Sequence, residues 1–163
     1  MPRKPRPEQT HSEFLPYLMN RVVGQINAPM QLQLRQRGLT MTHWRVLGFL
    51  CERDGLIISE LADRTLTDQA TLSRALDRLQ ARGLIQRRVA REDSRRIEVH
   101  LCAAGRVLNA ELARCARLVE DWAFAGMSAD ELEQLHRLLS RLSGVLTHRA
   151  ACAPTSAREE LAA

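Results

Sequence analysis

The segment from residue 58 to residue 101 constrains the fold of this chain more than any other part. It begins with the apolar spacing of two short amphipathic helices, separated by only two residues, at 58–65 and 68–82. Gly83 suits the left-handed conformation that ends a helix. The segment continues with a strand, a charged loop and a returning strand at 84–89, 90–95 and 96–101. This order predicts a helix-turn-helix followed by a β-hairpin, which places one helix in a DNA groove and an arm beside it.

The predicted helix at 68–82 has two contrasting faces. Its apolar residues recur with the spacing of a single buried stripe: Leu72, Ala75, Leu76 and Leu79. At about 3.6 residues per turn, the opposite face holds small or polar residues and one long cation: Ala70, Ser73, Arg74, Asp77 and Ala81. Small side chains let a helix backbone approach the floor of a groove closely. The second face is therefore the candidate surface for reading DNA.

The placement of positive charge supports a nucleic-acid partner. The 163-residue chain has a formal net charge of only +5, but one short segment contains five arginines: Arg87, Arg88, Arg91, Arg95 and Arg96. Residues 1–9 add three cations in a proline-rich stretch that is expected to be a disordered basic arm. Arginine suits forked contacts with phosphate and guanine. The base composition of the source genome is an alternative origin for part of this arginine bias.

Helical patterns account for most of the remaining chain. Thr10 and Glu13 fit a capping box at the start of a helix that ends near residue 37, and Pro29 is expected to kink or divide this helix. Further helices are expected at 41–53, at 103–125 and from residue 128 onward, and residues 56–58 can pair at the edge of the hairpin. The last helix carries more leucines than one chain's core needs, which predicts contact with a second subunit. The predicted fold class is mainly α (α+β).

Several functional classes find no support in the sequence. The four cysteines show no CxxC spacing and the five histidines are scattered, so neither a disulfide framework nor a metal site is expected. No apolar run approaches the roughly 20 residues of a membrane span, and no signal peptide is recognisable, so a cytoplasmic protein without membrane contact is expected. The absence of paired catalytic carboxylates, a nucleophile elbow and a phosphate-binding glycine loop argues against an enzyme and against a cofactor.

Taken in order, these segments resemble the MarR family of bacterial winged helix-turn-helix regulators over roughly residues 12–148. The most specific match is Asp93-Ser-Arg95 in the charged loop, which is similar to the family's D-x-R signature. Weaker matches are LTMTHWRVL at 39–47, ELA at 60–62, ATLSRALDRL at 70–79, RGLI at 82–85 and LCAAG at 101–105. The chain departs from the family at Cys102, where the family often has threonine. It also has no cysteine before Cys51, unlike the family's peroxide sensors.

The resemblance implies a homodimeric repressor of transcription. It implies one domain at 10–148, with a winged helix-turn-helix at 41–101 between dimerisation helices at 10–37 and 103–148, followed by a C-terminal tail at 149–163. Such regulators bind a pseudo-palindromic operator in double-stranded DNA. They commonly release it when a small phenolic or other aromatic ligand enters the crevice between the dimerisation and DNA-binding parts.

Ten residues are the candidates for contact with DNA: Gln69, Ala70, Thr71, Ser73, Arg74, Arg78, Arg91, Asp93, Arg95 and Arg96. Arg74 is expected to grip guanine O6 and N7, and the alternative is an exposed arginine paired with Asp77. Arg95 is expected to enter a narrow minor groove. Asp93 is expected to orient Arg95 or close the turn, because an acid facing DNA would be repelled. Arg91 and Arg96 suit phosphate contacts.

By analogy with the family, five residues are candidates for lining a ligand crevice: Phe14, Tyr17, Arg21, His43 and Trp44. For each aromatic residue alone, core packing is the alternative. The alternative function is a redox-sensing regulator of the same fold that switches through a cysteine, with Cys102 or Cys152 as the candidate. Cys51 and Cys115 are expected to be buried.

Overall fold

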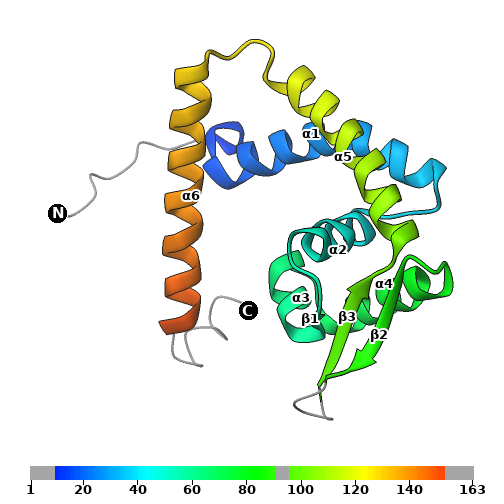
Figure 1. The fold of residues 1–163 in the computed structure, drawn as a ribbon. Helices are drawn as coiled ribbons and strands as arrows, with labels where there is room; N and C mark the ends of the chain where they lie inside the picture. Colours follow the sequence, from blue (N-terminus) through cyan, green and yellow to red (C-terminus); the bar gives the residue numbers. More distant parts are fainter. Residues whose placement is uncertain (1–9, 91–95, 153–163) are drawn as a thin grey trace. The chain divides into compact units, whose positions relative to one another are not determined.

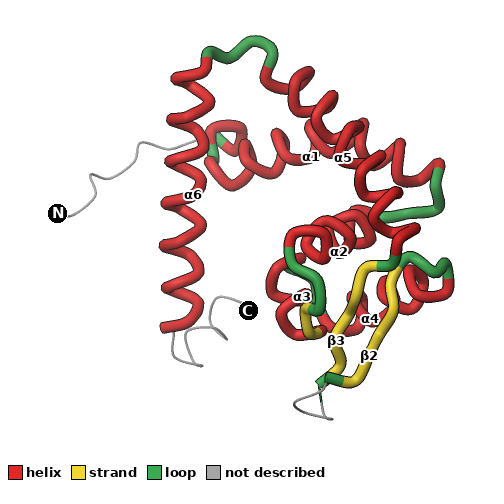
Figure 2. The backbone as a smooth tube through the Cα atoms, in the orientation of Figure 1, coloured by secondary structure: helices red, strands yellow, loops and turns green. Residues whose placement is uncertain are grey.

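The computed structural model describes residues 10–90 and 96–152 and is mainly helical, with one small sheet (Figures 1 and 2). The helices are η1 (His11–Glu13, a 3-10 turn), α1 (Leu15–Gln36), α2 (Met41–Glu52), α3 (Ile58–Thr65), α4 (Gln69–Ala81), α5 (Ala103–Phe124) and α6 (Ala129–Cys152). The strands are β1 (Leu56–Ile57), β2 (Ile85–Val89) and β3 (Ile97–Leu101). The predicted fold class and the order of helix, turn, helix and hairpin are confirmed.

The chain divides into two compact units, up to Asp121 and from Trp122 onward. The first unit contains α1 to α4, the sheet and most of α5, and the second contains the end of α5 and all of α6. Across the described ranges, no helix combines the length and the apolar character that a membrane crossing needs.

The core of the first unit lies where α2, α3 and α4 meet the sheet. The stripe predicted on α4 is inside it, because Leu72, Leu76 and Leu79 are all 0% exposed. The other elements supply buried aliphatic side chains as well: Met30, Leu34, Leu39, Val46, Leu47, Leu50, Leu56, Leu61, Leu84, Ile85, Val99, Leu101 and Leu112. Burial of so much aliphatic surface stabilises the helix-turn-helix as a rigid platform.

The sheet is antiparallel, with strand order β1-β3-β2. Leu56 pairs with Val99, so the short apolar segment before α3 joins the edge of the hairpin as predicted. Ile85 pairs with Leu101 at the other side of β3. All four of these residues are buried, whereas the far end of the hairpin is exposed, which matches a strand pair anchored at its base.

The start and the middle of α1 differ from the prediction. The Thr10–Glu13 capping contacts form, with Thr10 N–H donating to Glu13 Oε2 at 3.1 Å, but they close the short η1 turn. The long helix begins afterwards, with Pro16 in its first turn, where a residue without an N–H costs least. Of the two expectations for Pro29, division of α1 is wrong, because the helix continues on both sides of it to Gln36, and a kink there stays a prediction.

Asp54 joins the end of α2 to the base of the hairpin. Its Oδ1 accepts from the Leu101 N–H at 2.7 Å, and its Oδ2 lies 3.2 Å from His100 Nδ1 and 3.7 Å from Arg106. Burial alone would raise the pKa of Asp54, but the hydrogen bonds from Leu101 and His100 outweigh it and lower that pKa. One carboxylate thus connects α2, β3 and the first turns of α5.

Candidate nucleic-acid interface

The outward face of α4 is the surface that the sequence predicted. Ala70, Ser73, Arg74, Asp77 and Ala81 are all exposed, while the opposite face is buried in the core. Asp68 caps the helix, because its side chain accepts from the Thr71 N–H at 2.9 Å. The N-terminal half of α4 is therefore both well anchored and accessible, as a helix that enters a major groove requires.

Arg74 lies along this face rather than pairing with a neighbouring acid. Its Nε donates to the Ala70 carbonyl at 3.3 Å and its Nη2 to Thr71 Oγ1 at 3.4 Å. Asp77, its alternative partner, instead accepts from Arg87 at 2.7 Å. The two hydrogen bonds of Arg74 are long and weak, so its guanidinium can turn toward a base edge at little cost.

The other predicted DNA contacts fall in three places. Gln69 and Arg78 are exposed on α4, and Thr71 is half-buried there. Arg96 is exposed at the start of the returning strand. The remaining three predictions, Arg91, Asp93 and Arg95, lie outside the described residues.

A polar hollow of about 290 Å³ opens beside α4, at the N-terminus of α2. Its lining is cationic or neutral, with no acid: Thr40, Thr42, His43, Thr71, Arg74, Ala75 and Arg78. A helix N-terminus and two guanidinium groups both favour an anion, so this hollow extends the positive surface of α4 toward α2.

His43 is only 2% exposed at this place, although it was expected to line a ligand crevice. Its Nδ1 accepts from the Thr40 N–H at 3.0 Å and so closes a capping box at the start of α2. Its Nε2 is buried and has no hydrogen-bond partner among the described residues. Burial first, and then the charges of Arg78 and Arg82, lower the pKa of His43 and keep the ring neutral.

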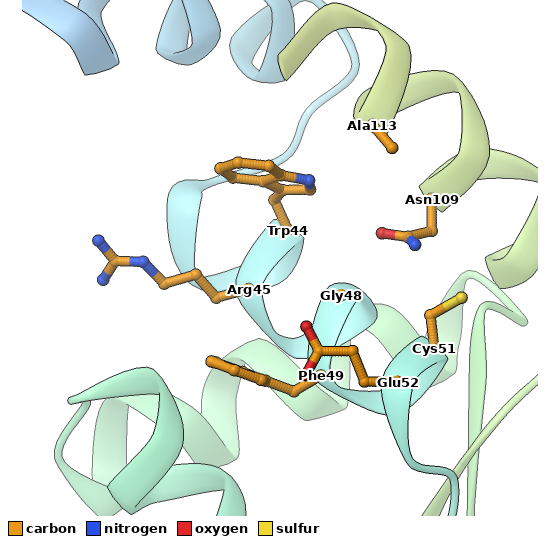
Figure 3. Close-up of a pocket in the computed structure, with 8 residues that line it drawn as sticks. All are labelled: Trp44, Arg45, Gly48, Phe49, Cys51, Glu52, Asn109 and Ala113. Carbon is orange, nitrogen blue, oxygen red and sulfur yellow. The ribbon is translucent and has the colours of Figure 1, made fainter. Parts of the chain in front are cut away.

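A second concavity, a groove of about 440 Å³, lies between α2 and α5 (Figure 3). One wall carries residues from successive turns of α2: Trp44, Arg45, Gly48, Phe49, Cys51 and Glu52. The other wall consists of Asn109 and Ala113, one turn apart on α5. Two aromatic rings on the α2 wall, together with a cation (Arg45), an acid (Glu52) and an amide (Asn109), suit a small aromatic molecule with polar groups.

Only one of the five predicted crevice residues, Trp44, lines this groove. Phe14, at the N-cap of α1, and Tyr17 and Arg21, on α1, are exposed and are not among its lining residues. The sequence reasoning missed Arg45, Phe49 and Asn109. Trp44, Gly48 and Cys51 have the i, i+4, i+7 spacing of one helix face. This spacing, visible in the sequence, indicates a second face of α2 beside the buried one.

The expectation that Cys51 is buried is wrong. Cys51 is exposed, because it follows the core residue Leu50 and turns toward the α2–α5 groove instead of the core. Cys102 is half-buried, and Cys115 is half-buried against the core. The side chain of Cys152 lies outside the described residues.

Two links connect the groove to the helix-turn-helix. Arg45 donates from Nη1 to the Thr65 carbonyl, at the end of α3, over 3.4 Å. The guanidinium of Arg64, also in the last turn of α3, lies over the ring of Phe49, 5.8 Å from its centroid. A movement of Arg45 or Phe49 in the groove would therefore change a direct contact with the last turn of α3, which leads into the turn before α4.

Comparison with known proteins agrees with this arrangement. A family model described as "MarR family" matches residues 37–96. The chain is 36% identical to a MarR-family transcriptional regulator of known structure from Silicibacter pomeroyi, with a TM-score of 0.73, over 80% of this chain and 88% of that one. It is 25% identical over 136 residues to the HTH-type transcriptional repressor IacR of Pseudomonas putida, over 83% of this chain and 81% of that protein.

A third relative connects this fold with a small ligand. The structure of BpsR from Bordetella bronchiseptica, a protein whose DNA binding is regulated by 6-hydroxynicotinic acid, is 26% identical with a TM-score of 0.77. The match covers 84% of this chain and 98% of that one. The first two relatives are transcriptional regulators by name, and none of the three is described as an enzyme.

Proposed function

Because the chain belongs to the MarR family of transcriptional regulators, we propose that it is a homodimeric repressor that binds a palindromic operator and leaves it when a small aromatic ligand binds. The observation that carries the DNA-binding part is the exposed face of α4, with Arg74 at its centre and the buried stripe behind it. The operator contacts we propose are the ten residues named from the sequence, with backbone phosphates beside the polar hollow at α2.

Exposed apolar side chains support the dimer. On α1 and at its N-cap they are Phe14, Leu15, Tyr17, Leu18, Met19, Val22, Val23 and Leu32. On α6 they are Leu138, Leu139, Leu142, Val145 and Leu146. A soluble monomer rarely leaves so many large apolar side chains in water, and a second copy would cover them. We accordingly propose that the helices at 10–37 and 103–148 form the dimerisation region.

The chemistry of the α2–α5 groove favours an aromatic carboxylate as the ligand. Trp44 and Phe49 offer apolar faces for a ring, and Arg45 and Asn109 offer donors for a carboxylate or hydroxyl group. A carboxylate that recruits Arg45 would draw its guanidinium away from the Thr65 carbonyl, which is only 3.4 Å away now. The turn before α4 would lose a support, and α4 would no longer hold the position that the operator requires.

The DNA-binding part is tested with a duplex that the wild-type protein enriches from a random-sequence pool, with binding followed by fluorescence anisotropy. Arg74→Ala and Arg95→Ala should each weaken binding by about 1–3 kcal/mol. Arg53→Ala, at an exposed arginine that lies outside both the proposed operator contacts and the proposed dimerisation region, makes the same change of charge and should bind like the wild type. Full affinity in both test variants would refute this assignment of the DNA-binding surface.

The ligand-binding part is tested by adding small aromatic acids, including 6-hydroxynicotinate, to the protein–DNA complex. Trp44→Ala should still bind the duplex but should need a much higher concentration of the releasing acid, because it removes an aromatic face of the groove. Arg45→Met lacks the hydrogen bond to the Thr65 carbonyl, so it should bind the duplex more weakly from the start and should respond little to the acid. Unchanged release in both variants would place the ligand site elsewhere.

A further inference from the structure

Leu66, in the turn between α3 and α4, is unusually exposed. Its side chain is 91% exposed, more than any other large apolar side chain in the described residues, and the next, Leu118, is 70% exposed. The residues beside it are fixed, because the hydroxyl of the buried Thr65 donates to the Leu61 carbonyl at 2.7 Å. A bulky apolar group thus projects into solvent from a well-anchored turn.

The backbone of Leu66 is also strained. Its φ of 51° and ψ of 45° are left-handed, and it is the one residue other than glycine with positive φ in the described part of the chain. Thr67 N–H donates to the Ala62 carbonyl at 3.1 Å and Leu66 N–H to the Asp63 carbonyl at 3.3 Å. This is the helix-ending motif in which glycine normally takes the left-handed position. The left-handed conformation is less favourable for leucine than for glycine or asparagine, so leucine at this position destabilises the turn.

Neither the strain nor the exposure of Leu66 is offset by a contact that the structure describes within the chain. Strained and exposed side chains of this kind concentrate where a protein meets a ligand. The position of Leu66 identifies which ligand: it stands two residues before Asp68, the cap of α4, at the same end of the helix as the exposed Gln69 and Ala70. This is the end of a recognition helix that enters the major groove.

We propose that Leu66 packs directly against a thymine C5-methyl group in the major groove and so selects thymine at one position of each half-site. The inference rests on the proposed function. Leucine has no donor or acceptor, and among the groups that base pairs expose in the major groove the thymine methyl is the apolar one. Because the turn is anchored by Thr65 and Asp68, the backbone of Leu66 is held in place before the DNA arrives, and binding has to order only its short side chain.

The test uses the duplex enriched by the wild-type protein and a set of copies in which each thymine is replaced by deoxyuracil, which removes only the methyl group. With wild-type protein, replacement at one thymine per half-site should weaken binding about fivefold. Leu66→Asn tolerates the left-handed backbone, so it should fold at least as stably. It should bind the parent duplex about fivefold less tightly and should lose the penalty for uracil at that thymine. Leu66→Met, which stays apolar, should keep both the affinity and the penalty.

Three results would overturn the proposal. If Leu66→Asn binds the parent duplex as tightly as the wild type, Leu66 makes no contact. If it binds weakly but the uracil penalty persists, the contact is with the sugar-phosphate backbone or another base. If it melts at a lower temperature than the wild type, the leucine stabilises the fold. Failure of the proposed function looks different: the wild-type protein would enrich no sequence, or Arg74→Ala would bind like the wild type.

Discussion

Arg87 on β2 donates from Nη1 to Asp77 Oδ1 on α4 at 2.7 Å. The same guanidinium donates from Nη2 to the Ser73 carbonyl at 3.3 Å, and its Nε is buried without a partner in the described residues. The side chain of Arg87 is 23% exposed, compared with 60% for Asp77. The first strand of the hairpin is therefore attached to α4 through a largely buried arginine whose two terminal nitrogens both donate within the chain.

Replacing Arg87 by methionine should lower the free energy of unfolding by about 0.5–1 kcal/mol, because the exposed Asp77 and the Ser73 carbonyl exchange their partner for water. Arg88→Met is the matched control: the neighbouring arginine is exposed, and its loss changes the net charge equally. Chemical denaturation at one protein concentration measures both. Equal stability of the two variants would show that the bridge contributes nothing to the fold.

Gly105 holds the first turn of α5 against the start of β2. A methyl group there would collide with the Leu84 carbonyl oxygen and approach Leu101 Cδ1 to 2.7 Å. Gly105→Ala should therefore lower the melting temperature and destabilise the fold by about 1–3 kcal/mol. Gly48→Ala in α2, with nothing within 4 Å of the added carbon, should instead gain about 0.5–1 kcal/mol. A stable Gly105→Ala variant would contradict this close packing.

His43 should make the fold less stable in mild acid. Its folded-state pKa lies below the ordinary value of 6.5, so below pH 6.5 the unfolded chain binds more protons than the folded one. Stability is then fully present above pH 6.5 and is lost as the pH falls toward the folded-state pKa. His43→Gln keeps an acceptor for the Thr40 N–H and should flatten this loss between pH 7.5 and pH 5.5. Denaturation curves at both pH values give the unfolding free energy of each protein. If the wild type and His43→Gln lose the same free energy between pH 7.5 and pH 5.5, His43 is not the cause.

Cys51 offers a chemical probe of the α2–α5 groove. Its exposed thiol should react with iodoacetamide faster than the half-buried Cys102 and Cys115, and peptide mass spectrometry can follow each site. Any aromatic acid that releases the DNA should slow the reaction at Cys51 and leave Cys115 unchanged. An acid that releases the DNA without protecting Cys51 would bind outside the groove. The redox alternative, with Cys102 or Cys152 as the candidate, is tested by a variant in which both are serine, and unchanged release by oxidant would exclude these thiols as the switch.

The local patterns predicted α4 and its two faces well, because they depend on spacing alone. Leu72, Leu76 and Leu79 fall on one side of any helix over those residues, and Ser73 and Arg74 on the other. The cap at Asp68 follows from the same local chemistry. Cys51 was misplaced because the relation between two faces of α2 depends on the position of α5, which is more than 50 residues later in the chain.

The sequence by itself thus determined the helices, the turns, the hairpin and the candidate reading face, since each depends on residues within a few positions of one another. Only the tertiary structure decided that Arg87, and not Arg74, pairs with Asp77, that His43 is buried, and that Arg45 links a groove to the end of α3. The physical reason is that the role of a charged or polar side chain is set by its neighbours in space. Those neighbours come from segments whose approach no local periodicity encodes.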